Sequence, residues 1–96
     1  MTAYVHVNLR VLDATLQASL APRFQAALER AGGRIVHFGP VVDHLEGAVI
    51  PLPLAGIFAF ETLEAARAFY LSADYAPIKV DRLRAQEARM FIVNCT

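Results

Sequence analysis

Hydrophobic and polar residues alternate strictly at the start of the chain. Val5, Val7, Leu9 and Val11 occupy every second position, and between them stand Tyr4, His6, Asn8 and Arg10. Successive side chains of a strand point to opposite faces, so this period predicts a strand over residues 3–11. One face of that strand is apolar, and the other is polar without being simply charged.

A repeat of large apolar side chains at four-residue spacing follows and predicts a helix. Its members are Leu12, Leu16, Leu20, Phe24 and Leu28. Asp13 is the expected N-cap, because its carboxylate can accept from backbone N–H groups two or three residues on. Pro22 is expected either to kink the helix or to lie in the first turn of a second segment. Gly32 and Gly33 are expected to end it, since glycine readily takes the left-handed conformation of a C-terminal cap.

Two further strands are predicted on either side of a long connection. Residues 34–38 are short and apolar-rich, and alternation predicts that Ile35 and His37 share one face. A Gly-Pro pair stops this strand, and a loop or short hairpin arm reaches to about Pro53. Residues 54–60, LAGIFAF, are apolar on both faces, which predicts a strand inside the sheet.

The C-terminal third predicts helix followed by strand. Thr62 is a plausible N-cap for the helix-forming run LEAARAFYL. A last helical segment is expected to start at Ser72 or Asp74 and to reach about Arg84. Residues 87–94 then alternate as the fourth strand.

The predicted order is β-α-β-β-α-β, which is an α+β, ferredoxin-like arrangement. It places both helical regions on one face of a four-stranded antiparallel sheet and leaves the other face bare. On that face the first strand offers Tyr4 and His6, and the inner strand has no polar face. Two copies packed sheet to sheet would close a dimeric α+β barrel, so we expect a homodimer with His6 hydrogen-bonded in the interface.

Composition supports the same expectation. Ninety-six residues predict a single domain over residues 1–96. Hydrophobic residues make up 56% of the chain, against about 45–50% in a typical soluble domain. A small domain with this much apolar surface is often covered by a second subunit.

Charge and motifs argue against several classes of partner. Nine basic and nine acidic residues give zero net charge without a basic run, so neither nucleic acid nor an anionic membrane is an expected partner. The longest apolar run, AVIPLPLAGIFAF, contains two prolines and falls short of the roughly 18–20 residues of a membrane span. The N-terminus lacks a signal-peptide pattern, so we expect a cytoplasmic protein. The single cysteine, Cys95, excludes an internal disulfide.

Three stretches carry a family resemblance. They are AGGRIVHFG, LEG (Leu45 to Gly47) and FETLEAARAFYLSADYAPIKVDR. In this order and spacing they make nearly the whole chain resemble the family catalogued as domain of unknown function 1330, small proteins with the dimeric α+β-barrel fold. The last stretch contains the family's run of an aromatic residue, Tyr, Ser, Tyr and a downstream Arg, here Phe69, Tyr70, Ser72, Tyr75 and Arg82.

The chain departs from the family pattern at four positions. Phe38 stands where an arginine is usual and Phe69 where a tryptophan is usual, while Leu54 and Ala59 replace strand charges. The resemblance implies that this member lacks part of any polar family site. Relatives on the same fold imply that an enzyme of this kind would be a cofactor-independent isomerase or monooxygenase, so no cofactor is expected.

The stretch HFGPVVDHLEG, residues 37–47, gathers two histidines, an aspartate and a glutamate. A metal would need about three donors converging at roughly 2.0–2.2 Å, and this spacing does not pair the imidazoles, so we expect no metal. The alternatives are a ligand pocket and a polar loop. In the loop, Asp43 and Glu46 would bond the local backbone and His44 would face solvent.

His37 is the candidate catalytic residue. If Ile35 faces the helices, His37 is expected to point between sheet and helices and to act as a general base. The alternative is a core or rim histidine bonded to a backbone carbonyl.

The candidate ligand-binding residues are Glu46, Tyr70, Ser72, Tyr75 and Arg82. A guanidinium of Arg82 drawn inward offers a fork for a carboxylate, from Glu46 or from an acidic ligand. The tyrosines could instead be core residues and Ser72 a cap. We therefore expect a small protein that binds or slowly converts a small organic molecule in a mostly apolar pocket. The alternative is a non-catalytic dimeric structural or interaction module.

Overall fold

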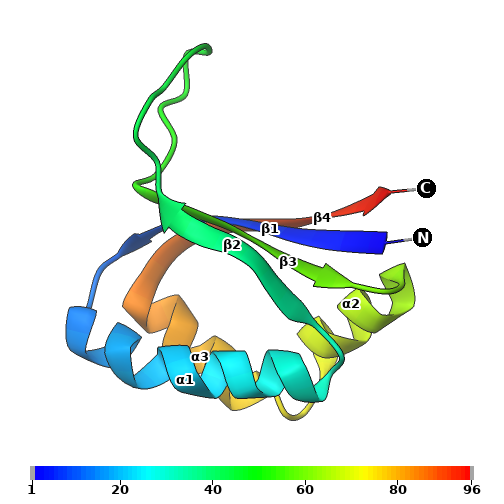
Figure 1. Cartoon of the computed structure of the whole chain (residues 1–96). Helices are drawn as coiled ribbons and strands as arrows, with labels where there is room; N and C mark the ends of the chain where they lie inside the picture. The colour runs from blue at the N-terminus through cyan, green and yellow to red at the C-terminus, as the bar shows by residue number, and fades with distance from the viewer. Residues whose placement is uncertain (1, 96) are drawn as a thin grey trace.

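The computed structural model of the chain describes residues 2–95. The elements in chain order are β1 (Thr2–Val11), α1 (Ala14–Arg30), β2 (Arg34–Pro40), β3 (Leu54–Phe60), α2 (Leu63–Leu71), α3 (Ala76–Ala85) and β4 (Gln86–Cys95). The strands form one sheet in the order β2-β3-β1-β4, and each neighbouring pair is antiparallel. The helices all lie on one side of the sheet (Figure 1). The predicted ferredoxin-like α+β arrangement is confirmed.

The two central strands behave as their patterns predict. In β1 the residues Ala3, Val5, Val7 and Leu9 are buried, and the residues between them are only partly buried. β3 pairs with β1 on one side and with β2 on the other, so it lies inside the sheet as predicted.

Helix α1 continues through Pro22 as one helix, so a new segment at this proline, one of the two expected alternatives, is wrong. The proline ring removes one donor, but Ala18 and Pro22 are both exposed, and water can satisfy the freed carbonyl of Ala18. Asp13 caps the helix as expected, accepting a 3.0 Å hydrogen bond from the Leu16 amide. At the other end Gly32 has φ +83°, the left-handed conformation that glycine takes readily.

Strand β2 contains a bulge, and the bulge changes which of its residues face the helices. Ile35 pairs with Phe58, but the register shifts at Val36, so that His37 pairs with Ile57 and Phe38 with Gly56. Directly paired residues lie on the same face of a sheet. Ile35 and Phe38 therefore face the helices, and His37 faces the other way. The expectation that His37 shares a face with Ile35 is wrong.

The core between sheet and helices is rich in aromatic rings. Phe24 of α1 lies 5.0 Å from Phe58 and 5.9 Å from both Phe69 and Tyr75, measured between ring centroids. Phe69 also packs against Phe60. Contacts at these distances fix α1, α2 and the start of α3 against one side of the sheet.

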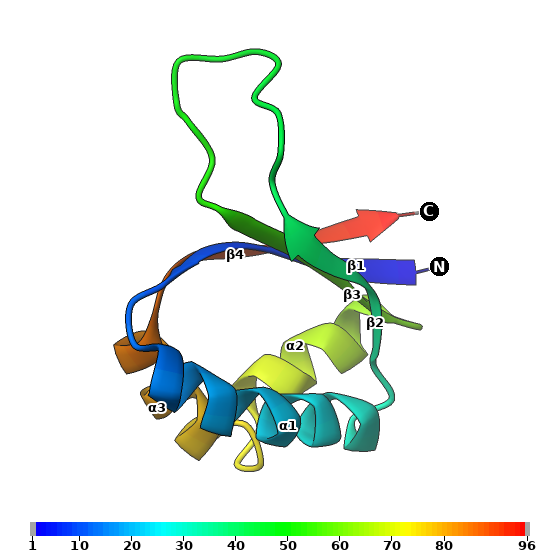
Figure 2. The same ribbon diagram turned by 60° about the vertical axis from the view of Figure 1, so that its left-hand side comes forward.

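The other side of the sheet is uncovered, and the connection between β2 and β3 rises from it (Figures 1 and 2). We call this connection, residues 41–53, the arm. Its base is closed by a 2.8 Å hydrogen bond from the Val41 amide to the Pro53 carbonyl. It exposes four large apolar side chains, Val42, Leu45, Val49 and Ile50. Among residues 2–95 no helix combines the length and apolar character needed to cross a membrane.

Candidate functional site

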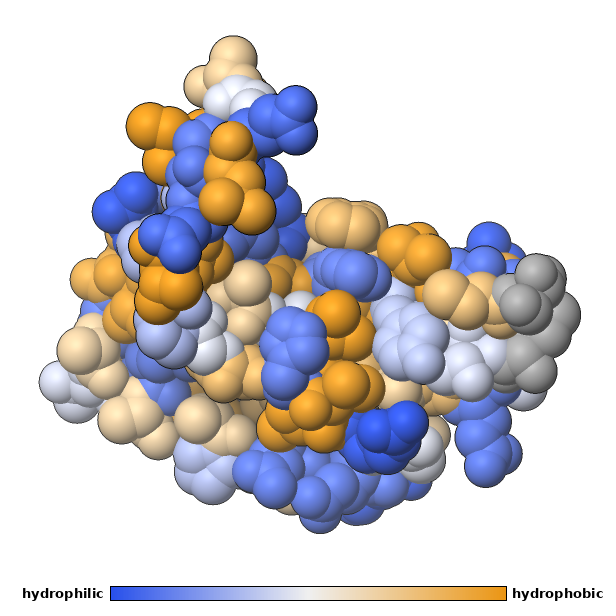
Figure 3. All heavy atoms as spheres, turned by 45° about the horizontal axis from the view of Figure 1, so that its top comes forward, coloured by the Kyte–Doolittle hydropathy of each residue, from blue (hydrophilic) through white to orange (hydrophobic). Residues whose placement is uncertain are grey.

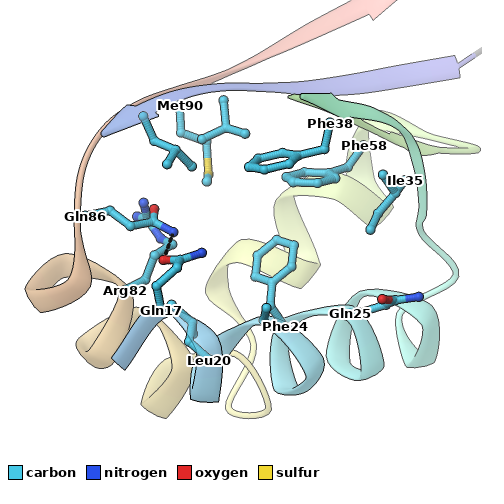
Figure 4. Close-up of a pocket in the computed structure, with 13 residues that line it drawn as sticks. Gln17, Leu20, Phe24, Gln25, Ile35, Phe38, Phe58, Arg82, Gln86 and Met90 are labelled. Atoms are coloured by element: carbon cyan, nitrogen blue, oxygen red, sulfur yellow. Dashed lines mark hydrogen bonds between the residues drawn. The ribbon is translucent and has the colours of Figure 1, made fainter. Parts of the chain in front are cut away.

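A cavity of about 180 Å³ lies between the sheet and helix α1, near α3. Residues from six elements line it (Figure 4), namely Val7, Leu9, Gln17, Leu20, Ala21, Phe24, Gln25, Ile35, Phe38, Phe58, Arg82, Gln86 and Met90. Most of this lining is apolar, and Arg82 is the one charged member among the residues that the structure describes. The cavity is the candidate functional site.

The first polar contribution comes from Arg82 of α3. Its side chain is 6% exposed, and its Nε donates a 2.8 Å hydrogen bond to the hydroxyl of the completely buried Tyr75. Burial raises the pKa of the Tyr75 hydroxyl, and the guanidinium of Arg82 opposes part of that rise. Tyr75 therefore stays neutral near pH 7 and acts as an acceptor for Arg82.

The second polar contribution is a pair of glutamines beside Arg82. Gln86, the first residue of β4, is 8% exposed and donates from Nε2 to Oε1 of Gln17 at 2.8 Å (Figure 4). The other amide atom, Oε1 of Gln86, is buried and has no hydrogen-bond partner in the part of the chain described. One end of the cavity thus presents the cation of Arg82 beside a glutamine pair, and the unpaired Gln86 oxygen is enclosed by protein atoms.

The opposite end is apolar and leads to the surface. Phe38 and Ile35 of β2 point toward the cavity while remaining partly exposed, and Gln25 on α1 is exposed beside them (Figure 4). The Phe38 ring lies over Gly56, because a Cβ at Gly56 would stand 2.5 Å from its Cδ2. The missing side chain at position 56 leaves room for Phe38 to turn inward.

A second cavity of about 370 Å³ lies toward α2 and shares Phe24, Phe58 and Met90 with the first. Tyr70 lines it, and the ammonium group of Lys79 lies 4.2 Å from the centre of the Tyr70 ring. The charged member of its lining is Arg67, whose side chain is exposed. Without a buried polar group, this space offers less to orient a ligand than the first.

The expected site residues do not all meet. Arg82 lines the first cavity, and Tyr75 accepts a hydrogen bond from the Arg82 side chain. Tyr70 lines the second cavity. Ser72 serves as a cap, because its Oγ donates to the Phe69 carbonyl at 2.8 Å and accepts from the Tyr75 amide at 3.1 Å. His37 faces the uncovered side of the sheet, and Glu46 lies on the exposed arm. The expected position of His37 between sheet and helices is therefore corrected.

The polar loop agrees with the expectation in part. His44 is exposed as expected, and its Nε2 lies 2.6 Å from the Gly47 carbonyl oxygen. The local backbone bonds expected of Asp43 and Glu46 are not formed with any described residue. In residues 2–95 no three His, Cys, Asp or Glu side chains converge in a way that would hold a metal ion.

Gln17 and Gln86 were not among the predicted site residues, although each carried a sequence signal. Gln17 lies three and seven residues before Leu20 and Phe24, on the apolar stripe of the helix. Gln86 extends the inward alternation of Ala88, Met90 and Ile92 by one step. A polar residue at an inward position marks a buried hydrogen bond or a site.

Comparison with solved structures shows the same fold at low sequence identity. A protein of unknown function from Rhodopseudomonas palustris superposes with a TM-score of 0.77 at 16% identity, covering 99% of this chain and 82% of that one. SnoaB, a cofactor-independent oxygenase from Streptomyces nogalater, gives 0.73 at 12% identity, with 99% and 93% covered. A dimeric ferredoxin-like protein of unknown function from Jannaschia gives 0.67 at 13% identity, with 99% and 100% covered.

Among curated proteins, no match was found. The sequence profile of one family, the domain of unknown function DUF1330, matches residues 2–96. This match covers nearly the whole chain and agrees with the motifs in the sequence. The protein belongs to the DUF1330 family.

Proposed function

We propose that this protein is a homodimer whose subunits each bind a small organic molecule in the cavity beside Arg82. One observation carries the proposal: a mostly apolar cavity ends at two buried polar side chains, Arg82 and Gln86. Apolar walls with a few convergent polar groups are typical of small-molecule sites. The walls would supply affinity, and the polar end would set the orientation of the ligand.

The proposal is confined to binding. No His, Asp or Glu is among the described residues that line the cavity, so a proton acceptor would have to come from the ligand or from water. The fold is shared with a cofactor-independent oxygenase, but at 12% identity that likeness concerns the fold alone. His37 and Glu46 do not line this cavity, so we assign them no role in binding there.

The dimer is proposed from the uncovered face of the sheet. Phe91 and Val93 of β4 are exposed there, and Phe91 stacks on His6 with ring centroids 5.0 Å apart. Apolar residues occur on this face and on the arm in Figure 3. A twofold axis would pack two such faces together and cover both. Proteins with this fold from Jannaschia and from Bacteroides fragilis are described as dimeric.

A non-catalytic dimeric module is the second candidate. The arm favours it, because Leu45 is 92% exposed although it is a large apolar side chain. Such a residue is unfavourable in water and suits an interface. In this alternative the cavity would be a packing defect of the core and would stay empty of ligand.

Binding of a neutral aromatic probe separates the two candidates. We expect indole to shift backbone amide resonances of the cavity lining in a two-dimensional NMR titration of the full chain. Ala21→Phe, at the exposed rim of the cavity, should weaken indole binding by about tenfold or more. Ala18→Phe is the matched control, because Ala18 is exposed on the same helix and does not line the cavity.

Two results would speak against the binding proposal. Indole that shifts no resonance of the lining would favour the structural module. Equal losses in Ala21→Phe and Ala18→Phe would place the binding elsewhere on helix α1 or attribute the loss to the fold.

A further inference from the structure

The charge of Arg82 is uncompensated within the described chain. The ion pairs there are Arg10 with Glu87, Arg23 with Asp81 and Arg30 with Asp74, and Arg82 takes part in none of them. Its one hydrogen bond is the donation from Nε to Tyr75, which is neutral. A buried cation without a counter-charge is unfavourable, because burial removes the water that would otherwise solvate it. An anion in the cavity would compensate it.

The guanidinium of Arg82 also has the geometry to bind an anion. The bond to Tyr75 uses Nε and fixes the plane of the group, while the two terminal nitrogens make no hydrogen bond to another described residue. Terminal guanidinium nitrogens form a planar fork that matches the two oxygens of a carboxylate. Since Arg82 is the only charged residue among the described residues of the lining, a single negative charge suffices.

The glutamine pair beside Arg82 is already in place without a ligand. Nε2 of Gln86 donates to Gln17, which holds the side chain in one orientation, and its Oε1 is enclosed by protein atoms. At the polar end it is therefore Arg82 that is free to bind a ligand, and its charge calls for an acid group.

The rest of the cavity limits the size and character of the ligand. An apolar cavity of about 150 Å³ accommodates benzene, so the volume of about 180 Å³ suits one ring with small substituents. Phe24, Phe38 and Phe58 border this space, and Met90 adds a thioether. Aromatic rings and a methionine sulfur make favourable contacts with an aromatic ligand.

We propose that the cavity binds a monocyclic aromatic acid, with its carboxylate on the terminal nitrogens of Arg82. This inference rests on the proposed binding function and names the chemical class of the ligand. It predicts that the protein discriminates between ligands by their charge.

Calorimetric titrations at pH 7 with two probes test it: 3-hydroxybenzoate and its methyl ester. We expect the wild-type protein to bind 3-hydroxybenzoate about tenfold more tightly than the neutral ester. Arg82→Met should abolish this preference.

Arg84→Met is the matched control, because Arg84 is exposed on the same helix and lines neither cavity. It should leave the preference for the acid over the ester unchanged. Arg82→Met removes the bond to Tyr75, so thermal unfolding is measured alongside. If that variant does not fold, the Arg82 Nε–H resonance of the wild-type protein decides the matter: at saturation it should shift further with 3-hydroxybenzoate than with the ester.

The two proposals fail in different ways. Equal binding of acid and ester to the wild-type protein overturns the inference while leaving the binding function in place. A preference for the acid that survives Arg82→Met, or that Arg84→Met removes as well, places the carboxylate elsewhere and also overturns it. If neither these probes nor indole bind, the proposed function itself is wrong.

Discussion

Nε of Arg82 donates a hydrogen bond to the hydroxyl oxygen of Tyr75, and both side chains are buried. The two residues lie seven positions apart, Tyr75 directly before α3 and Arg82 near its end. The bond fixes the guanidinium at the polar end of the cavity. Loss of this hydrogen bond should therefore affect both the stability of the fold and the position of the guanidinium in the site.

We expect Tyr75→Phe to lower the free energy of unfolding by about 1–3 kcal/mol, because a buried charged donor would lose its acceptor. Urea unfolding followed by circular dichroism measures this change. Tyr70→Phe is the control, since Tyr70 is partly exposed and its hydroxyl makes no hydrogen bond to another described residue. Equal effects of the two substitutions would show that the bond to Arg82 contributes little.

The raised pKa of Tyr75 predicts a loss of stability in alkali. An unfolded tyrosine ionises near pH 10, while burial keeps the folded one protonated to higher pH. Its contribution is therefore complete below about pH 10 and is lost as the pH rises from there through the folded pKa. Urea unfolding between pH 8 and 11 should show a steeper decline for the wild-type protein than for Tyr75→Phe. Parallel curves would contradict the assignment.

The base of the arm is held to β1 by the hydrogen bonds of one asparagine. Asn8 donates from Nδ2 to the carbonyls of Leu52 and Leu54 at 2.9 and 2.8 Å, and its Oδ1 accepts from the Leu52 amide at 2.9 Å. Asn8→Ala should destabilise the protein by about 1–3 kcal/mol, because these backbone groups would lose partners. Exchange of the Leu52 amide and proteolysis of the arm should both become faster. Asn94→Ala, at an exposed position in β4, should change neither rate.

The uncovered face of the sheet predicts a dimer that a single charge disrupts. Phe91→Glu should raise the dissociation constant of the dimer by about tenfold or more, since a carboxylate in the interface would lose its hydration. Analytical ultracentrifugation measures the effect. Leu83→Glu is the control: Leu83 is 61% exposed, against 54% for Phe91, but belongs to a helix on the other side of the sheet. A wild-type protein that is monomeric at micromolar concentration would refute the dimer.

The sequence alone determined the order of elements and much of the core. The two-residue period of β1 and the four-residue repeat of α1 reflect the spacing of side chains on strand and helix, which is local and independent of the partner strand. Gly32 could likewise be recognised as a helix end, because the preference for a left-handed conformation belongs to the residue itself. These local rules were enough to predict the ferredoxin-like arrangement.

The tertiary structure decided which residues share the cavity. Simple alternation places His37 on the same face of the sheet as Ile35. The bulge at Val36 instead turns His37 to the uncovered face and Phe38 to the face that meets the helices. Gly56 on the neighbouring strand leaves room for the Phe38 ring. A bulge depends on the pairing of two strands, so the pattern of one strand cannot reveal it. Gln17 and Gln86 lie 69 residues apart, and only the packing of α1 beside the start of β4 joins them next to Arg82. The site is polar at one end because these long-range contacts, and not any local motif, bring its groups together.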